Sequence, residues 1–226
     1  MIDNSKQVMT HSMESLLLST MQINNLSSGS SSEVLNDIHK KEKNIVVYNR
    51  SILSLNWDIN QLLACGVEIK LQGSVEEIEE ELHVLLADKS ISPSFIKDAT
   101  YLLDSFREVS QAQDFRLMLA TVNSNMCRKF HTDINTIRML CTYAGPGTEW
   151  LSDDVTEQIQ SQHHGRKGDV IVDESFIYRV GTGDVVILKG ALYPEGNPIM
   201  HRSPSIELSG GKRLLLRIDV NENPWA

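Results

Sequence analysis

From residue 115 onward the chain is a succession of short apolar stretches separated at close intervals by turn-forming residues. Glycine stands with proline, asparagine or aspartate at residues 145–147, 181–184 and 194–197, and as a Gly-Gly pair at residues 210–211. Short strands at such spacing are typical of a sandwich or barrel. We predict strands near residues 115–122, 127–131, 137–143, 169–172, 176–180, 184–189, 199–201 and 212–219.

Two amphipathic helices precede the predicted strands. Ser74 and Glu77 form a capping box at the start of the first, and Ser92-Pro93 is a start signal for the second. The apolar positions at helical spacing are Val75, Ile78, Leu82, Leu85 and Leu86, then Phe95, Ala99, Leu102, Leu103 and Phe106. We therefore predict a mainly β, α+β fold, in which a helical part at residues 44–111 packs on a barrel domain at residues 112–226.

Residues 1–43 differ from the rest in composition. They contain the serine-rich segment "NNLSSGSSSE" and the charge run "HKKEK", neither of which buries much apolar surface. We predict that residues 1–43 form a low-complexity, flexible tail.

The overall composition excludes several classes of partner. A formal net charge of -9 argues against non-specific binding to nucleic acid or to an anionic membrane, and no apolar run approaches the length of a membrane span. Three cysteines without close pairing argue against a disulfide framework. We expect a cytoplasmic protein whose partner is a small-molecule or protein substrate.

A candidate metal site begins in the stretch "CRKFHTDINTIRML". His131 and Asp133 are two residues apart, so on an extended strand both side chains point to one face. The pair alone is a weak signal, because His-x-Asp occurs by chance. His201 follows 68 residues after Asp133, beyond an apolar strand and a loop. Two histidines and one carboxylate bind one face of iron in non-haem Fe(II) oxygenases, so we predict that these three residues bind a metal.

Arginines follow on the next predicted strand. Arg213 and Arg217 are four residues apart and share a face, and Arg202 adjoins His201. A guanidinium group matches the planar fork of a carboxylate, and a buried one needs an anion. That anion is either a bound carboxylate or a protein carboxylate such as Asp219 or Glu149. We expect Arg213 to bind a carboxylate, with Arg217 as the second candidate.

These residues resemble a known enzyme fold. His131-x-Asp133, the strand "GDVVILKG", His201 and Arg213 resemble the double-stranded β-helix of the 2-oxoglutarate/Fe(II)-dependent dioxygenases, a jelly-roll, cupin-like fold. The segments "CRKFHTD", "RMLCTYAGPGTEWL" and "MHRSP" are still more similar to a bacterial family of unknown function, over most of the chain after residue 44.

The dioxygenase resemblance implies a function. Fe(II) would be held by His131, Asp133 and His201, and 2-oxoglutarate would chelate it with its far carboxylate on an arginine. O2 would then be used to oxidise a C–H bond of the substrate. Tyr143 is similar to the tyrosine that often touches the co-substrate. The dioxygenase pattern has a serine two positions after the arginine, and Leu215 stands there in this chain. This departure concerns the identity of the co-substrate more than the metal site.

A second function stays open at this point. The family of unknown function tends to be encoded near zinc-homeostasis proteins, which favours a non-enzymatic, cupin-like protein that holds zinc. Cys127 shares the strand parity of His131, so it is either a fourth, thiolate ligand or a small core residue.

Overall fold

The computed structural model describes residues 23–124, 127–163, 172–206 and 211–221. Residues 1–22 of the predicted tail, and the strand predicted at residues 169–172 except for its last residue, lie outside the described residues.

Seven strands form a major sheet in the order β1-β2-β8-β5-β10-β4-β3. Their bounds are Leu26–Gly29 for β1, Ile45–Tyr48 for β2, Glu68–Gly73 for β3, Phe115–Val122 for β4, Ile137–Ala144 for β5, Val185–Lys189 for β8 and Arg213–Val220 for β10. A minor sheet has the order β7-β6-β9. It consists of β6 at Glu149–Trp150, β7 at Tyr178–Arg179 and β9 at His201–Arg202, and His131 adds an isolated antiparallel bridge to His201.

The chain crosses repeatedly between the two sheets. From β4 it passes to the His131 bridge in the minor sheet, returns to β5, crosses to β6 and β7, returns to β8, crosses to β9 and ends on β10. The central order β8-β5-β10-β4 therefore faces β7-β6-β9 and the bridge, which is the winding of a double-stranded β-helix. Together with the flanking helices, this confirms the predicted fold class.

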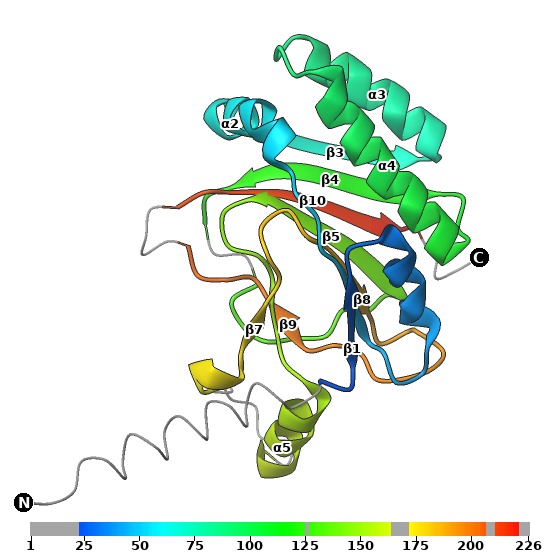
Figure 1. Cartoon of the computed structure of the whole chain (residues 1–226), viewed down its shortest axis with the longest axis vertical. Helices are drawn as coiled ribbons and strands as arrows, with labels where there is room; N and C mark the ends of the chain where they lie inside the picture. Colours follow the sequence, from blue (N-terminus) through cyan, green and yellow to red (C-terminus); the bar gives the residue numbers. More distant parts are fainter. Residues whose placement is uncertain (1–22, 125–126, 164–171, 207–210, 222–226) are drawn as a thin grey trace, which may run out of the picture.

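Helices cover the outer face of the major sheet (Figure 1). They are α2 at Asn56–Cys65, α3 at Val75–Ala87 and α4 at Pro93–Ser110, with the 3-10 helices η1 at Ser32–His39 and η2 at Leu53–Leu55. The predicted capping box of Ser74 and Glu77 is present at the start of α3, and Pro93 begins α4. Helix α5 at Asp153–His163 and η3 at Glu174–Phe176 connect β6 to β7 on the other side of the sheet. The sequence reasoning missed α5, whose composition is mostly polar.

Successive side chains of β10 point to opposite faces of the major sheet and pack into two different hydrophobic cores. Leu214, Leu216 and Ile218 belong to the cluster beneath the helices, whereas Leu215 belongs to the cluster between the two sheets. Arg213, Arg217 and Asp219 share the parity of Leu215, so they face the space between the sheets. This inner face carries the candidate site.

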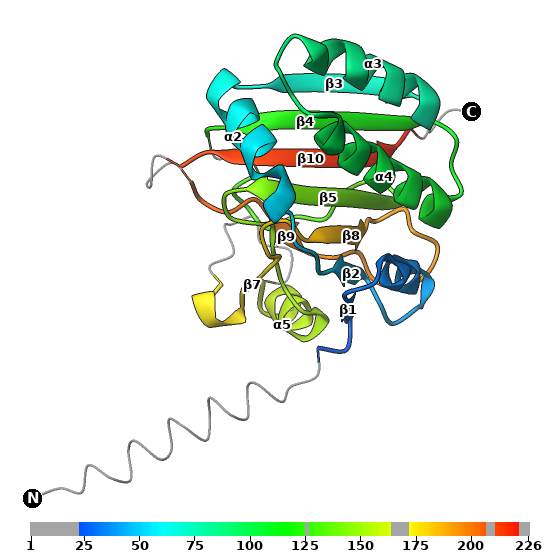
Figure 2. The ribbon, with the colours of Figure 1, turned by 45° about the horizontal axis from the view of Figure 1, so that its top comes forward.

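The predicted tail and its boundary need correction. Within residues 1–43, β1 pairs in parallel with β2, and Leu35 and Ile38 of η1 are buried in the outer core. Two apolar residues three apart bury one side of a short helix even where serines dominate the local composition. Strands β2 and β3, from the predicted helical part, also belong to the major sheet, as Figure 2 shows. No helix in the described part of the chain is long and apolar enough to cross a membrane.

Candidate metal centre

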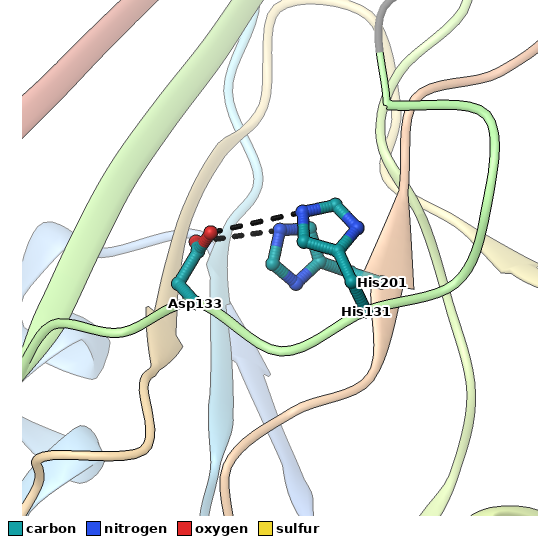
Figure 3. Close-up of side chains that lie close together, drawn as sticks. All are labelled: His131, Asp133 and His201. Carbon is teal, nitrogen blue, oxygen red and sulfur yellow. Dashed lines mark ion pairs between the residues drawn. The ribbon is translucent and has the colours of Figure 1, made fainter. Parts of the chain in front are cut away.

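The three predicted metal ligands meet between the sheets. The backbone N–H of His131 donates to the carbonyl of His201 over 3.0 Å, and the N–H of His201 donates back over 2.9 Å. This pairing brings the two imidazole rings to a centroid distance of 4.6 Å. The carboxylate of Asp133 points toward both rings (Figure 3), with Oδ1 3.7 Å from His131 Nε2 and Oδ2 3.4 Å from His201 Nε2.

Backbone carbonyls fix the orientation of both imidazoles. Nδ1 of His131 lies 3.0 Å from the carbonyl of Lys129, and Nδ1 of His201 lies 3.3 Å from the carbonyl of Ile199. A neutral histidine that donates from Nδ1 keeps the lone pair of Nε2 free, here on the side of Asp133. Burial lowers the pKa of His201 to about 4, against the opposing effect of Asp133, and this keeps the ring neutral. A metal ligand requires that protonation state.

The spacing of the donor atoms fits one divalent metal. Ligand atoms about 2.0–2.2 Å from a metal, at octahedral or tetrahedral angles, lie about 2.8–3.6 Å from one another. The three candidate ligand atoms all lie within 4.8 Å of one another, and the two carboxylate contacts are close to that range. Two imidazole nitrogens and one carboxylate oxygen suit iron or zinc.

Arg138, which the sequence reasoning missed, fixes the carboxylate of Asp133. Its Nη1 donates to Asp133 Oδ2 over 2.5 Å, and its Nε donates to Asp219 Oδ1 over 2.6 Å. Asp219 is 3% exposed and also accepts from Arg217 Nε and Asn135 Nδ2. One carboxylate oxygen of Asp133 is therefore engaged by the protein, and Oδ1 is left for a metal. The only sequence signal was the position of Arg138 near the start of the next strand, which does not identify its partner.

A cavity of about 60 Å³ lies beside the metal cluster. His131 and His201 line one part of it, and Arg213 and Arg217 from β10 line another. Cys127 also lines it, and the carbonyl of Cys127 accepts a hydrogen bond from the N–H of Ser203. The cavity thus joins the metal cluster to the predicted carboxylate-binding arginines.

Of the three candidate arginines, Arg213 differs from the other two in its partners. Arg217 Nε pairs with Asp219 at 3.0 Å, and Arg202 Nε pairs with Glu149 at 2.7 Å. The Arg213 side chain donates from Nη2 to Thr142 Oγ1 over 3.1 Å. Within the part of the chain that the structure describes, Arg213 has no carboxylate partner and its Nε has no acceptor. Burial lowers its pKa to about 10, against the opposing attraction of Glu149, and the group remains a cation at neutral pH.

Tyr143 does not lie in this cavity, and its predicted contact with a co-substrate is wrong. It shares the parity of Met139 and Cys141 on β5, which face the helices. Its hydroxyl donates to Asp98 Oδ2 over 2.7 Å, and its ring packs on Phe95. Because successive residues of a strand face opposite sides, Thr142 faces the space between the two sheets and Tyr143 faces the helices.

A family model matches residues 29–219 of this chain. The chain belongs to the family described as protein of unknown function, DUF1826. No curated protein matches it in sequence. This confirms the prediction, made from the sequence motifs, that the chain belongs to a family of unknown function.

Solved structures of dioxygenases resemble the fold at low identity. One is the dioxygenase for auxin oxidation 1 of Arabidopsis thaliana in complex with 2-oxoglutarate, with a TM-score of 0.49, 9% identity, and 86% of this chain and 91% of that chain covered. Another is a prolyl-4-hydroxylase of Pseudomonas putida, with a TM-score of 0.46, 9% identity and coverage of 84% and 98%. At these scores the likeness carries no argument about activity, and the double-stranded β-helix follows from the strand order.

Proposed function

We propose that this protein is a non-haem Fe(II) dioxygenase that uses 2-oxoglutarate as co-substrate and oxidises a C–H bond of its substrate. The observation that carries the proposal is Arg213. It is a guanidinium that is 1% exposed, has no carboxylate partner among the described residues, and lines the same cavity as His131 and His201. An unpaired buried charge costs several kcal/mol, so the arrangement favours a bound anion.

Each residue has a defined role in this proposal. His131, His201 and Oδ1 of Asp133 would hold Fe(II), while Arg138 keeps the other oxygen of Asp133 away from it. The iron, when bound, supplies the activation of O2. Arg213 would bind the far carboxylate of 2-oxoglutarate through its Nε and Nη groups, and Thr142 orients the guanidinium from the neighbouring strand.

The cavity must widen when 2-oxoglutarate binds. A water molecule occupies about 30 Å³ of liquid, so a cavity of about 60 Å³ holds on the order of two waters. The side chains of Arg202 and Arg217 are 25% and 37% exposed, and both form part of the wall. They are the groups that can move outward without opening the apolar core between the sheets.

Two measurements on one preparation test the proposal. Protein purified without air is loaded with Fe(II), and its metal content is determined together with the succinate formed from 2-oxoglutarate and O2. We expect one iron per chain and slow succinate formation even without the primary substrate. A protein that binds iron but neither binds nor consumes 2-oxoglutarate would overturn the enzyme proposal and keep the metal site.

Cys127 supports a second candidate function, a zinc-holding protein without enzymatic activity. Its side chain lies outside the three-residue cluster but lines the same cavity. A thiolate added to two imidazoles and one carboxylate makes four ligands, the number typical of a closed zinc site. In that case Cys127→Ser would weaken zinc binding at least tenfold, and 2-oxoglutarate would not bind. Under the dioxygenase proposal the same variant keeps its iron.

A further inference from the structure

We propose that the substrate of this metal centre is an anionic molecule, and that Lys70, Arg116 and Arg217 bind its carboxylate or phosphate group. That this molecule is the substrate rests on the proposed function. The anion site itself depends only on the residues that line the hollow.

The three cations line one hollow of about 260 Å³ on the major sheet. Lys70 of β3 and Arg217 of β10 are both in register with Met118 of β4, so they flank it across three adjacent strands. Arg116 precedes Met118 by two residues and therefore points to the same face. Strand register thus places an ammonium and two guanidinium groups around the side chain of Met118.

This hollow adjoins the metal cavity. Met118 and Arg217 line both spaces. A larger cavity of about 750 Å³ lies beside the first turn of α5, but it shares no lining residue with the metal cavity among the residues that the structure describes. A substrate group in the hollow over Met118 therefore lies next to the space in which chemistry would take place.

The charge of the hollow opposes that of the whole chain. The formal net charge is -9, yet the charged residues that line the hollow are all cations. Arg116 is exposed and has no ion pair within the described ranges. Lys70 pairs with Glu68 at 2.6 Å, but both side chains are 67% exposed, and such a surface pair contributes little.

Arg217 is only partly neutralised. Its partner Asp219 is shared with Arg138, which also pairs with Asp133, so Arg217 has only part of one carboxylate. An anion placed over Met118 would therefore meet one exposed cation without a partner, one with a weak partner and one with a shared partner. Arginine donors arranged in a planar fork suit carboxylate and phosphate oxygens, and a local positive field attracts anions.

The size of the hollow limits the group that it binds. A volume of about 260 Å³ corresponds to about eight or nine water molecules, which suits a small acid or one acidic end of a larger molecule. Its floor at Met118 is apolar and adaptable, so it also suits a short carbon chain that continues toward His131 and His201.

The test uses inorganic phosphate and acetate as probes, with the full-length, metal-free protein and isothermal titration calorimetry at low salt. We expect saturable binding of at least one probe, and the tighter probe distinguishes a phosphate from a carboxylate substrate. The Lys70→Gln/Arg116→Gln variant should bind it at least tenfold more weakly. The matched control is Lys89→Gln/Lys97→Gln, which removes the same charge from exposed sites on the helical side, and it should bind within about twofold of the wild type.

Three outcomes would overturn the anion site: no saturable binding of either probe, unchanged binding in the Lys70→Gln/Arg116→Gln variant, or an equal loss in the control. Arg213→Gln should keep the probe site, which separates it from the 2-oxoglutarate contact. Metal content is measured on the same preparations. Anion binding in a protein that takes up no metal would keep the anion site and reject the dioxygenase proposal, whereas the reverse result would reject the anion site alone.

Discussion

Arg50 and Arg213 have largely buried side chains on opposite faces of the major sheet, and their partners differ. On the helical side, Arg50 donates from Nη1 and Nη2 to both carboxylate oxygens of Asp98, at 2.5 and 3.0 Å, and Tyr143 donates to the same carboxylate. On the inner side, Arg213 donates to the hydroxyl of Thr142. Burial acts to lower the pKa of both groups, but the hydrogen bonds to Asp98 raise that of Arg50 well above its usual value, whereas the pKa of Arg213 falls to about 10.

This difference in partners indicates that Arg50 belongs to a structural ion pair and that Arg213 is a candidate binding residue. The Arg50–Asp98 pair satisfies its own charges and ties α4 to the strands beneath it. Arg213 forms no ion pair with a carboxylate among the described residues, although Glu149 attracts it, and it lies next to a cavity that two imidazoles also line. An apolar residue at this position would avoid the cost of burying a charge, as Leu215 does on the same face of β10.

The largest expected effect lies on the inner face. His201→Ala removes one of three metal ligands, so we expect metal affinity to fall by more than about 100-fold and stoichiometric binding to be lost. Titration with Fe(II) or zinc, followed by metal analysis, measures this. Asp98→Ala on the helical face is the comparison and should leave affinity unchanged in the folded protein. Retention of one metal per chain in His201→Ala would remove the basis for the site.

The two buried arginines should also differ in their contribution to stability. Asp98→Ala leaves Arg50 buried without its carboxylate, so we expect the free energy of unfolding to fall by about 3–5 kcal/mol. Arg213→Met removes a buried charge that has no carboxylate partner among the described residues and keeps a similar volume, so we expect the free energy of unfolding to stay the same or to rise, by up to about 4 kcal/mol. Urea denaturation of the metal-free proteins measures both values. Equal losses in the two variants would contradict the contrast drawn between the two faces.

Arg138 offers a sharper test of how the inner face is organised. Arg138→Gln should weaken metal binding by about 10- to 100-fold, because Asp133 loses the donor that orients it. The electronic spectrum of bound cobalt(II) should change as well, and Arg138→Lys should restore part of the affinity. Arg179→Gln is the matched control, since Arg179 pairs with Glu149 and Glu174 in the minor sheet. An unaltered spectrum in Arg138→Gln would show that Asp133 is positioned without it.

The smallest expected effect concerns Cys127. Its thiol lines the cavity but does not belong to the metal cluster, so Cys127→Ser should change Fe(II) affinity by less than about twofold. The same titration with zinc tests the alternative function, that of a zinc-holding protein without enzymatic activity. A tenfold or greater loss of zinc affinity would assign the inner face to a four-ligand zinc site.

Period-two patterns predicted the long strands β4, β5, β8 and β10, and the order and spacing of His131, Asp133 and His201, together with the dioxygenase resemblance, predicted that these three residues converge. The strand predicted at residues 115–122 matches β4, and the one at 184–189 starts one residue before β8. Spacing of two on an extended segment fixes which side chains share a face, and the turn residues fix where the chain reverses. The strand predicted at residues 127–131 is reduced to a bridge at His131, because Cys127 has a backbone φ of 30° that an extended strand does not allow.

Local patterns could not predict the contacts that connect distant segments. Arg138 and Asp219 are 81 residues apart, and their ion pair depends on the register of β5 against β10. The orientation of Tyr143 depends on which parity of β5 faces the helices, and a strand that is apolar at nearly every position does not reveal this. The serine-rich composition near the N-terminus likewise concealed β1, whose pairing is with a strand elsewhere in the sheet.

The most direct test of the account is the affinity of the Fe(II)-loaded protein for 2-oxoglutarate, measured without air by isothermal titration calorimetry. The account predicts one site per chain in the wild type, and about 10- to 100-fold weaker binding in Arg213→Ala with iron still bound, because charged hydrogen bonds to a carboxylate are lost. Arg217→Ala should bind within a few-fold of the wild type. Equal affinity in the wild type and Arg213→Ala, or no binding in an iron-loaded wild type, would contradict the claim that Arg213 holds the co-substrate.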